Sequence, residues 1–134
     1  MTDAASRVRS LVDGVNRGDI SVADDVLARD CVVHITGRAD PIVGVDAWKE
    51  HAAAVLMAFP DVRFTIEEIV TAGDIVATRW HGRGTHGGPF GPVPATGKAI
   101  SLVGLILDHF VDGKISVRWE QYDQPLVLQQ IGVA

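Results

Sequence analysis

The chain has 134 residues, of which 47% are hydrophobic and 22% are charged, and its formal net charge at pH 7 is −5. This length fits one domain, residues 1–134, with a core of its own. An acidic chain without a cluster of basic residues offers no surface for phosphates, which excludes nucleic acid as an expected partner. No run of 18 apolar residues is present, so we expect no membrane partner either.

The N-terminal half of the sequence predicts three helices. Residues 4–17 carry apolar side chains at helical spacing, and their mixed charges are unlike a secretory signal, which favours a cytoplasmic location. A short second helix, capped by Asp19 or Ser21, is expected to end near Leu27. Residues 45–59 predict a third helix that Pro60 ends, after a strand over 31–36.

Beyond Pro60 the apolar residues recur at every second position, which is typical of strands. Strands are expected from residue 62 onward and over 74–86, 98–111 and 114–123. Helices followed by a meander of strands indicate an α+β fold. The single cysteine, Cys31, lies among valines and is interpreted as a small buried hydrophobic residue.

The expected strand over 98–111 is apolar on both of its faces. If the helices cover one face, the other needs a second cover, and the same face of another copy of the chain could supply it. We assign Leu102, Ile106 and Phe110 to that outer face and expect a homodimer. The loop over 87–97 follows the preceding strand and is rich in Gly and Pro, so it is either a lid over a cavity or an inert connection.

Asp123 is the candidate acid of the last expected strand. Alternate strand residues point to one face, so the register that buries Ile115, Val117 and Trp119 also turns Asp123 inward. A carboxylate in an apolar wall has a raised pKa and can exchange protons near neutral pH. The alternative is that Asp123 only caps a helical turn that begins at Pro125.

His109 is the candidate partner of Asp123, and the hairpin turn decides which face it takes. A three-residue loop over 111–113 would pair Phe110 with Lys114 and place His109 on the face of Asp123. The same register sends Arg118 and Glu120 to the opposite face. The hydrophobic pattern favours this register, because a slip of one residue would invert every side chain.

Other kinds of site find little support in the sequence. His81 and His86 lie an odd number of residues apart and therefore point to opposite strand faces, and no zinc-binding spacing is present, so no metal site is expected. Proton transfer in an apolar pocket remains. Trp80, Leu105 and Trp119 would line this pocket, although both tryptophans could equally be core residues. His34 would lie at its mouth or be structural.

Five short motifs carry a resemblance to a known family. They are Phe-Pro-Asp at 59–61, Gly-Thr-His at 84–86, Gly-Pro-Phe at 88–90, Pro-x-Thr-Gly at 94–97 and Trp-x-x-x-Asp at 119–123. With them the chain resembles the SnoaL-like polyketide cyclases, members of the nuclear transport factor 2-like superfamily. The resemblance is strong over residues 59–132 and looser over the helices.

The resemblance implies a cone: a curved sheet wrapped on three helices around a deep apolar cavity. It implies an enzyme that closes a ring of an apolar, polyketide-like substrate by an intramolecular aldol reaction, without metal or cofactor. Asp123 would be the acid/base and His109 its helper. The expected substrate-binding residues are His34, Trp80, His86, Leu105, Trp119 and Gln121. The alternatives are a related isomerase, dehydratase or hydrolase, or a protein that binds a small ligand without catalysis.

Overall fold

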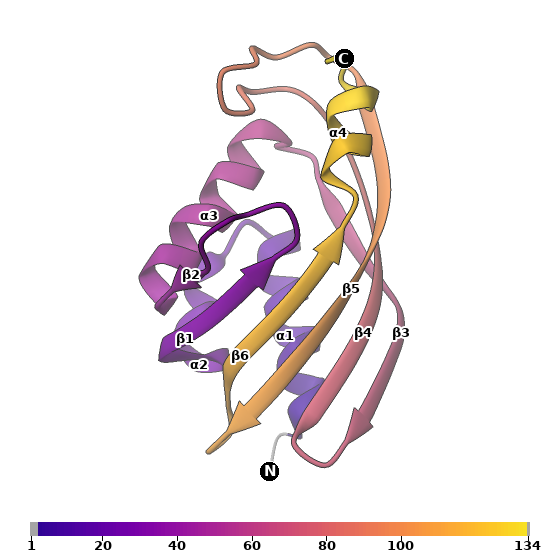
Figure 1. The fold of residues 1–134 in the computed structure, drawn as a ribbon. Coiled ribbons are helices and arrows are strands. Elements are labelled where there is room, and N and C mark those ends of the chain that lie inside the picture. Colours follow the sequence, from indigo (N-terminus) through magenta and orange to yellow (C-terminus); the bar gives the residue numbers. More distant parts are fainter. Residues whose placement is uncertain (1–2, 134) are drawn as a thin grey trace.

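The computed structural model describes residues 3–133 as helices packed against one curved sheet (Figure 1). The helical elements are α1 (Ala4–Asn16), the 3-10 turn η1 (Ile20–Val22), α2 (Ala23–Val26), α3 (Val45–Ala58) and α4 (Gln124–Gln130). The strands are β1 (Leu27–Ile35), β2 (Ile42–Val43), β3 (Arg63–Ala72), β4 (Ile75–Thr85), β5 (Ala99–Val111) and β6 (Lys114–Tyr122). The predicted α+β class is confirmed, and so are the three N-terminal helices and the four-strand meander.

The six strands form a single mixed sheet in the order β2-β1-β6-β5-β4-β3. Strands β3 to β6 are antiparallel neighbours, whereas β1 lies parallel to β6. Helices α1, α2 and α3 cover one face of this sheet, which we call the inner face, and leave the outer face free (Figure 1). No helix between residues 3 and 133 combines the length and the apolar character that crossing a bilayer requires.

Local contacts fix the helices on the inner face. The Asp3 carboxylate accepts a hydrogen bond of 2.7 Å from the Ser6 amide and so caps α1, whose Val8 and Leu11 are buried. At the other end of α1, Asn16 donates to the Phe64 carbonyl and accepts from the Phe64 amide, both at 2.8 Å. This pair of bonds joins α1 to the start of β3, because it satisfies both backbone groups of Phe64.

The hairpin between β5 and β6 differs from the prediction. Val111 pairs with Lys114, so the loop has two residues, and the positive φ angles of Asp112 (51°) and Gly113 (80°) are those of a type I′ turn. The pairing then shifts, since Phe110 lies opposite Ile115 but His109 lies opposite Val117. This β-bulge adds one residue to β6 and restores the predicted pairing of odd with odd positions.

The bulge also inverts the predicted faces of β6. Ile115 points inward, but beyond the bulge the inward residues are Arg118, Glu120 and Tyr122, and Trp119 is 50% exposed. On β5 the even positions are the inner ones, including Leu102, Ile106 and Phe110. The assignment of these three residues to an outer, pairing face was therefore wrong. The exposed apolar residues of β5 are Val103, Leu105, Leu107 and Val111.

The loop over 87–97 is tied to the C-terminal end of α3. The amides of Gly87 and Gly88 both donate to the Ala58 carbonyl, at 3.0 and 3.1 Å. A Cβ at position 88 would lie 2.0 Å from the Met57 carbonyl oxygen, so only glycine allows this close approach. The loop carries Phe90 to the wall of the cavity described below, which makes it part of that wall.

Candidate functional site

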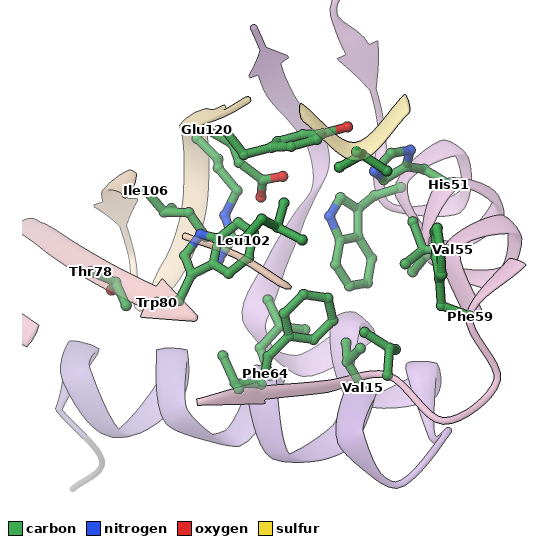
Figure 2. Close-up of a pocket in the computed structure, with 18 of the residues that line it drawn as sticks. Val15, His51, Val55, Phe59, Phe64, Thr78, Trp80, Leu102, Ile106 and Glu120 are labelled. Atoms are coloured by element: carbon green, nitrogen blue, oxygen red, sulfur yellow. The ribbon is translucent and has the colours of Figure 1, made fainter. Parts of the chain in front are cut away.

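A cavity of about 150 Å³ lies between the inner face of the sheet and the helices. Figure 2 shows that Glu120, Trp80 and Ile106 reach it from the sheet, while His51 and Val55 approach from the opposite side. Most of the lining side chains are apolar. An engineered apolar cavity of similar volume admits benzene, so this one has the size for an aromatic ring.

The polar residues of the cavity arise from the register of three strands. Across β4, β5 and β6, the pairing aligns three rows of inward side chains. These rows are Val76–Asp108–Arg118, Thr78–Ile106–Glu120 and Trp80–Gly104–Tyr122. Neighbouring strands lie about 4.8 Å apart, so side chains of one row and of adjacent rows are within mutual reach.

Asp108 and Arg118 form a buried ion pair at one end of this array. Arg118 donates from Nε to Oδ1 at 2.7 Å and from Nη2 to Oδ2 at 3.0 Å. The side chain of Asp108 is 0% exposed and that of Arg118 is 5% exposed. Burial disfavours the guanidinium charge, but Asp108 and then Glu120 outweigh this effect and raise the pKa of Arg118. Both oxygens of Asp108 are occupied, so this carboxylate is a structural partner rather than a free base.

Glu120 is the carboxyl group of the cavity that has no hydrogen-bond partner in the described chain. It is half-buried and lines the cavity, into which its side chain reaches from the sheet (Figure 2). Burial raises the pKa of Glu120; Arg118 opposes this shift and Asp108 adds to it. A carboxyl group whose pKa is moved toward neutrality can both take up and release a proton there.

Two further titratable side chains, Tyr122 and His51, line the cavity. Burial raises the pKa of the Tyr122 phenol, and the charge of Glu120 adds a smaller rise, so the phenol stays a hydrogen-bond donor at neutral pH. Burial lowers the pKa of His51, and the charge of Arg38 lowers it further, so the neutral form of this imidazole is favoured. Beside the paired Arg118, the cavity thus holds a phenol and an imidazole that both favour their neutral forms.

Five of the eight predicted site residues lie outside the cavity, on the outer face or at its edge, so their predicted placement was wrong. They are Asp123, His109, Leu105, Trp119 and Gln121. Asp123 is exposed and accepts a hydrogen bond of 3.0 Å from the Leu126 amide, so it caps α4, the alternative that the sequence left open. The predicted meeting of His109 and Asp123 in one pocket does not occur.

The remaining three predicted residues have different fates. Trp80 lines the cavity, as predicted. His34 stacks on Trp119 at 3.9 Å between ring centroids, which places it beside an outer-face residue. His86 is fully buried behind the cavity wall, where its Nδ1 lies 2.9 Å from the Thr96 hydroxyl and accepts from the Thr96 amide at 3.2 Å. It supports the loop over 87–97 and is not among the lining residues.

Sequence reasoning missed Glu120, Thr78, Tyr122 and His51. A signal for the first was present, because Asp108 and Arg118 are opposite charges on facing strands and Glu120 follows on the same side. The predicted register instead placed Arg118 and Glu120 on the face opposite the pocket. Nothing in the Ala-rich helix singled out His51. Within residues 3–133, no group of three His, Cys, Asp or Glu side chains is placed to hold one metal ion together.

Comparisons with known proteins agree on one family. The family model described as SnoaL-like polyketide cyclase matches residues 5–131, while no curated protein sequence matches the chain. IdmH from Streptomyces antibioticus, named as a candidate polyketide cyclase, is 30% identical, with a TM-score of 0.85 over 98% of this chain and 100% of that one.

Two further solved structures have similar scores. AclR from Streptomyces galilaeus, named as a candidate hydroxylase, is 26% identical, with a TM-score of 0.84 over 96% of this chain and 95% of that one. A candidate polyketide cyclase from Acidithiobacillus ferrooxidans is 27% identical, with a TM-score of 0.84 over 97% and 94%. These matches confirm the predicted nuclear transport factor 2-like fold.

Proposed function

Since the chain belongs to the SnoaL-like polyketide cyclase family, we propose that it is an acid/base enzyme that acts on an apolar small molecule in this cavity, with Glu120 as the proton carrier. One observation carries the proposal. Glu120 places a carboxyl group in an apolar cavity, and this carboxyl group forms no hydrogen-bonded ion pair. The proposed reaction is an intramolecular aldol cyclisation that requires no metal or cofactor.

The proposed steps use Glu120 twice. Its carboxylate removes a proton from a carbon next to a carbonyl group, and the electron pair of the broken C–H bond moves to the carbonyl oxygen. The resulting enolate carbon attacks a second carbonyl of the same molecule, and the new alkoxide takes the proton back from Glu120. General acid/base help of this kind contributes about 10²- to 10⁴-fold, and confinement of both reacting ends adds more.

Arg118 has a positioning role in this proposal. Its charge lowers the pKa of Glu120 against the effect of burial, while Asp108 neutralises most of that charge. Without Asp108, Arg118 would be free to pair with Glu120 and hold it as a permanent carboxylate. The ion pair thus leaves the pKa of Glu120 raised, which is the direction that helps one carboxyl group act as base and then as acid.

The test uses acetophenone in D₂O, because its methyl protons lie next to a carbonyl and exchange slowly without a catalyst. We expect the protein to accelerate deuterium uptake, measured by NMR, and E120Q to lose at least about 10²-fold of that acceleration. D123N is the matched control, since it makes the corresponding change at the exposed cap of α4. Full exchange in E120Q would refute the proposal, and so would a loss confined to D123N. A protein that binds acetophenone without accelerating exchange would be a binding protein instead.

A second candidate function, epoxide hydrolysis, is favoured by one observation. Asp108, Arg118 and Glu120 place two carboxylates around one guanidinium on the inner face. In this reaction Glu120 would take a proton from water as the water oxygen attacks an epoxide carbon and the carbon–oxygen bond of the epoxide breaks, and the resulting alkoxide would take that proton back from Glu120. Styrene oxide in ¹⁸O-labelled water tests it: the diol should carry one label, and E120Q should stop its formation.

A further inference from the structure

Helix α3 borders the cavity with a stripe of side chains that includes two polar ones. Trp48, His51 and Val55 all line the cavity, at the spacing of three and four residues that places side chains on one helix face. The core-facing stripe of a helix is normally apolar, because a polar group that loses water and gains no partner costs free energy. The indole N–H of Trp48 and the imidazole of His51 therefore need a partner.

Neither polar group finds this partner in the chain, and both remain open to a ligand. Neither side chain forms a hydrogen bond within residues 3–133. The polar atoms of that range that are both enclosed by protein and unpartnered are Thr78 Oγ1, Trp80 Nε1 and His86 Nε2. The nitrogens of Trp48 and His51 are not among them, so they keep accessible surface, and the cavity is the space that both side chains border.

These donors come from the side of the cavity opposite the acid. Figure 2 shows Glu120 reaching the cavity from the sheet and His51 approaching from the opposite side. Trp48 precedes His51 by nearly one turn of α3, so their side chains are neighbours. Tyr122 follows Glu120 on the same face of β6 and belongs to the side of the acid. A ligand between sheet and helix therefore meets a carboxyl group on one side and donors on the other.

The charge state of His51 suits a donor that faces a carboxyl group. Burial lowers the pKa of His51, and the charge of Arg38 lowers it further. A neutral imidazole carries one N–H donor, and an indole nitrogen can only donate. Because the neutral ring has no charge to pair with Glu120, it leaves that acid free to exchange its proton. The helix side of the cavity thus offers two N–H groups without a competing ion pair.

We propose that Trp48 Nε1–H and a ring N–H of His51 together bind the carbonyl oxygen of an apolar ketone and stabilise the enolate oxygen that forms there. This inference rests on the proposed function. When Glu120 takes the proton from the carbon next to the carbonyl, the C–H electron pair forms a carbon–carbon double bond and the π pair of the carbonyl moves to its oxygen. Fixed donors at that oxygen stabilise the charge as it develops, and loss of one such donor typically lowers kcat by about 10²- to 10³-fold.

Deuterium exchange of acetophenone tests each donor. We expect W48F and H51L each to lower kcat by about 10²-fold, while KM changes by less than about 10-fold, because the bond to the neutral ketone is weaker than the bond to the enolate. H51Q keeps an N–H donor and should recover at least about 10-fold of the rate that H51L loses. W119F makes the change of W48F on the outer face and should keep the parental rate.

A second measurement does not require W48F or H51L to fold. The chain has three tryptophans, so W80F and W119F identify the indole signal of Trp48 by elimination. Acetophenone should shift that N–H proton downfield by more than α-methylstyrene, which has a methylene group in place of the oxygen. By calorimetry the parent should bind the ketone about 10-fold more tightly. Equal shifts, equal affinities or a ketone that does not bind would overturn the inference.

The two proposals can fail separately. E120Q should lose exchange but keep the downfield shift of the Trp48 proton, because the donors do not depend on the charge of Glu120. If E120Q exchanges at the parental rate, the proposed function fails, while the shift still supports ketone binding by α3. If W48F and H51L keep the parental kcat while E120Q loses exchange, the assignment of the donors is wrong and the acid/base role of Glu120 stands.

Discussion

The two faces of strands β4 to β6 contrast in a way that average hydrophobicity does not reveal. The inner face, covered by helices, contains the charged groups Asp108, Arg118 and Glu120. The outer face exposes Leu105 at 57% and Trp119 at 50% of their surfaces. A bidentate ion pair is therefore buried on the covered side of the sheet, while large apolar side chains are exposed on the other. Charges can be buried where they pair and serve a site, and exposed apolar groups indicate a missing partner.

The contrast supports a homodimer through the outer face, which we propose in place of the pairing through Leu102, Ile106 and Phe110. One row of outward residues runs across four strands, from Ala77 through Leu107 and Trp119 to His34. Monomeric proteins rarely leave a connected apolar surface of this kind in water. A two-fold axis would allow each copy to cover the same surface of the other.

The largest effect is expected from breaking the inner ion pair. D108A removes both hydrogen bonds and the nearest counter-charge of the buried Arg118, so we expect the free energy of unfolding to fall by about 3–5 kcal/mol in urea titrations. E68A is the control, because it removes a surface ion pair in which the side chain of Glu68 is 63% exposed and that of Arg79 is 49% exposed. That loss should stay below about 1 kcal/mol. Equal losses for the two variants would contradict the assignment of the charged face to the interior.

The next prediction addresses the outer face. L105D should weaken self-association by at least about 10²-fold in sedimentation equilibrium, because a two-fold interface would bury the unpaired carboxylate twice. M57D is the control, since Met57 is 64% exposed on α3, on the helical side of the sheet. A parent protein that is monomeric at micromolar concentration would refute the dimer.

The close contact between Trp80 and Gly104 lies on the inner face, so a change there tests how tightly this face is packed. G104A forces the indole to move, and we expect a loss of about 1–3 kcal/mol in unfolding free energy, the usual cost of overpacking. A double-mutant cycle with W80L isolates the contact: in that background G104A should cost little. The same cost in both backgrounds would mean that another contact opposes the methyl group.

The sequence was sufficient to predict the helices, the meander and the fold class, because periodicity and capping residues are local signals. It did not predict the faces of β5 and β6. Leu102 and Leu105 are equally apolar, so the pattern of β5 allows either side to be buried, and the one-residue bulge beyond Ile115 inverts β6. Trp80 was placed on the correct face, because the polar residues Arg79 and His81 flank it in the sequence and the strand alternation turns them the other way. A buried acid such as Glu120 violates the patterning rule, as functional residues often do.

The pH dependence of stability tests the buried acid. The pKa of Glu120 is raised in the folded state, so above the ordinary pKa of about 4.3 the unfolded chain loses this proton first and stability falls as pH rises. The decrease continues until the folded group ionises, with a limiting slope of about 1.4 kcal/mol per pH unit. E120Q should remove this decrease and be the more stable protein at neutral pH in urea titrations.

The smallest effect is expected at Asp123, and it decides between the two interpretations that its sequence position allows. As the cap of α4, D123A should lower the unfolding free energy by about 1 kcal/mol, because the Leu126 amide loses its acceptor. D123N should change the unfolding free energy by only a few tenths of a kcal/mol, since asparagine caps helices about as well as aspartate. Both variants should exchange acetophenone protons at the parental rate, because Asp123 does not line the cavity. If D123N folds normally but loses exchange, the acid lies at the cap after all, and the face assignment drawn from the bulge in β6 is wrong.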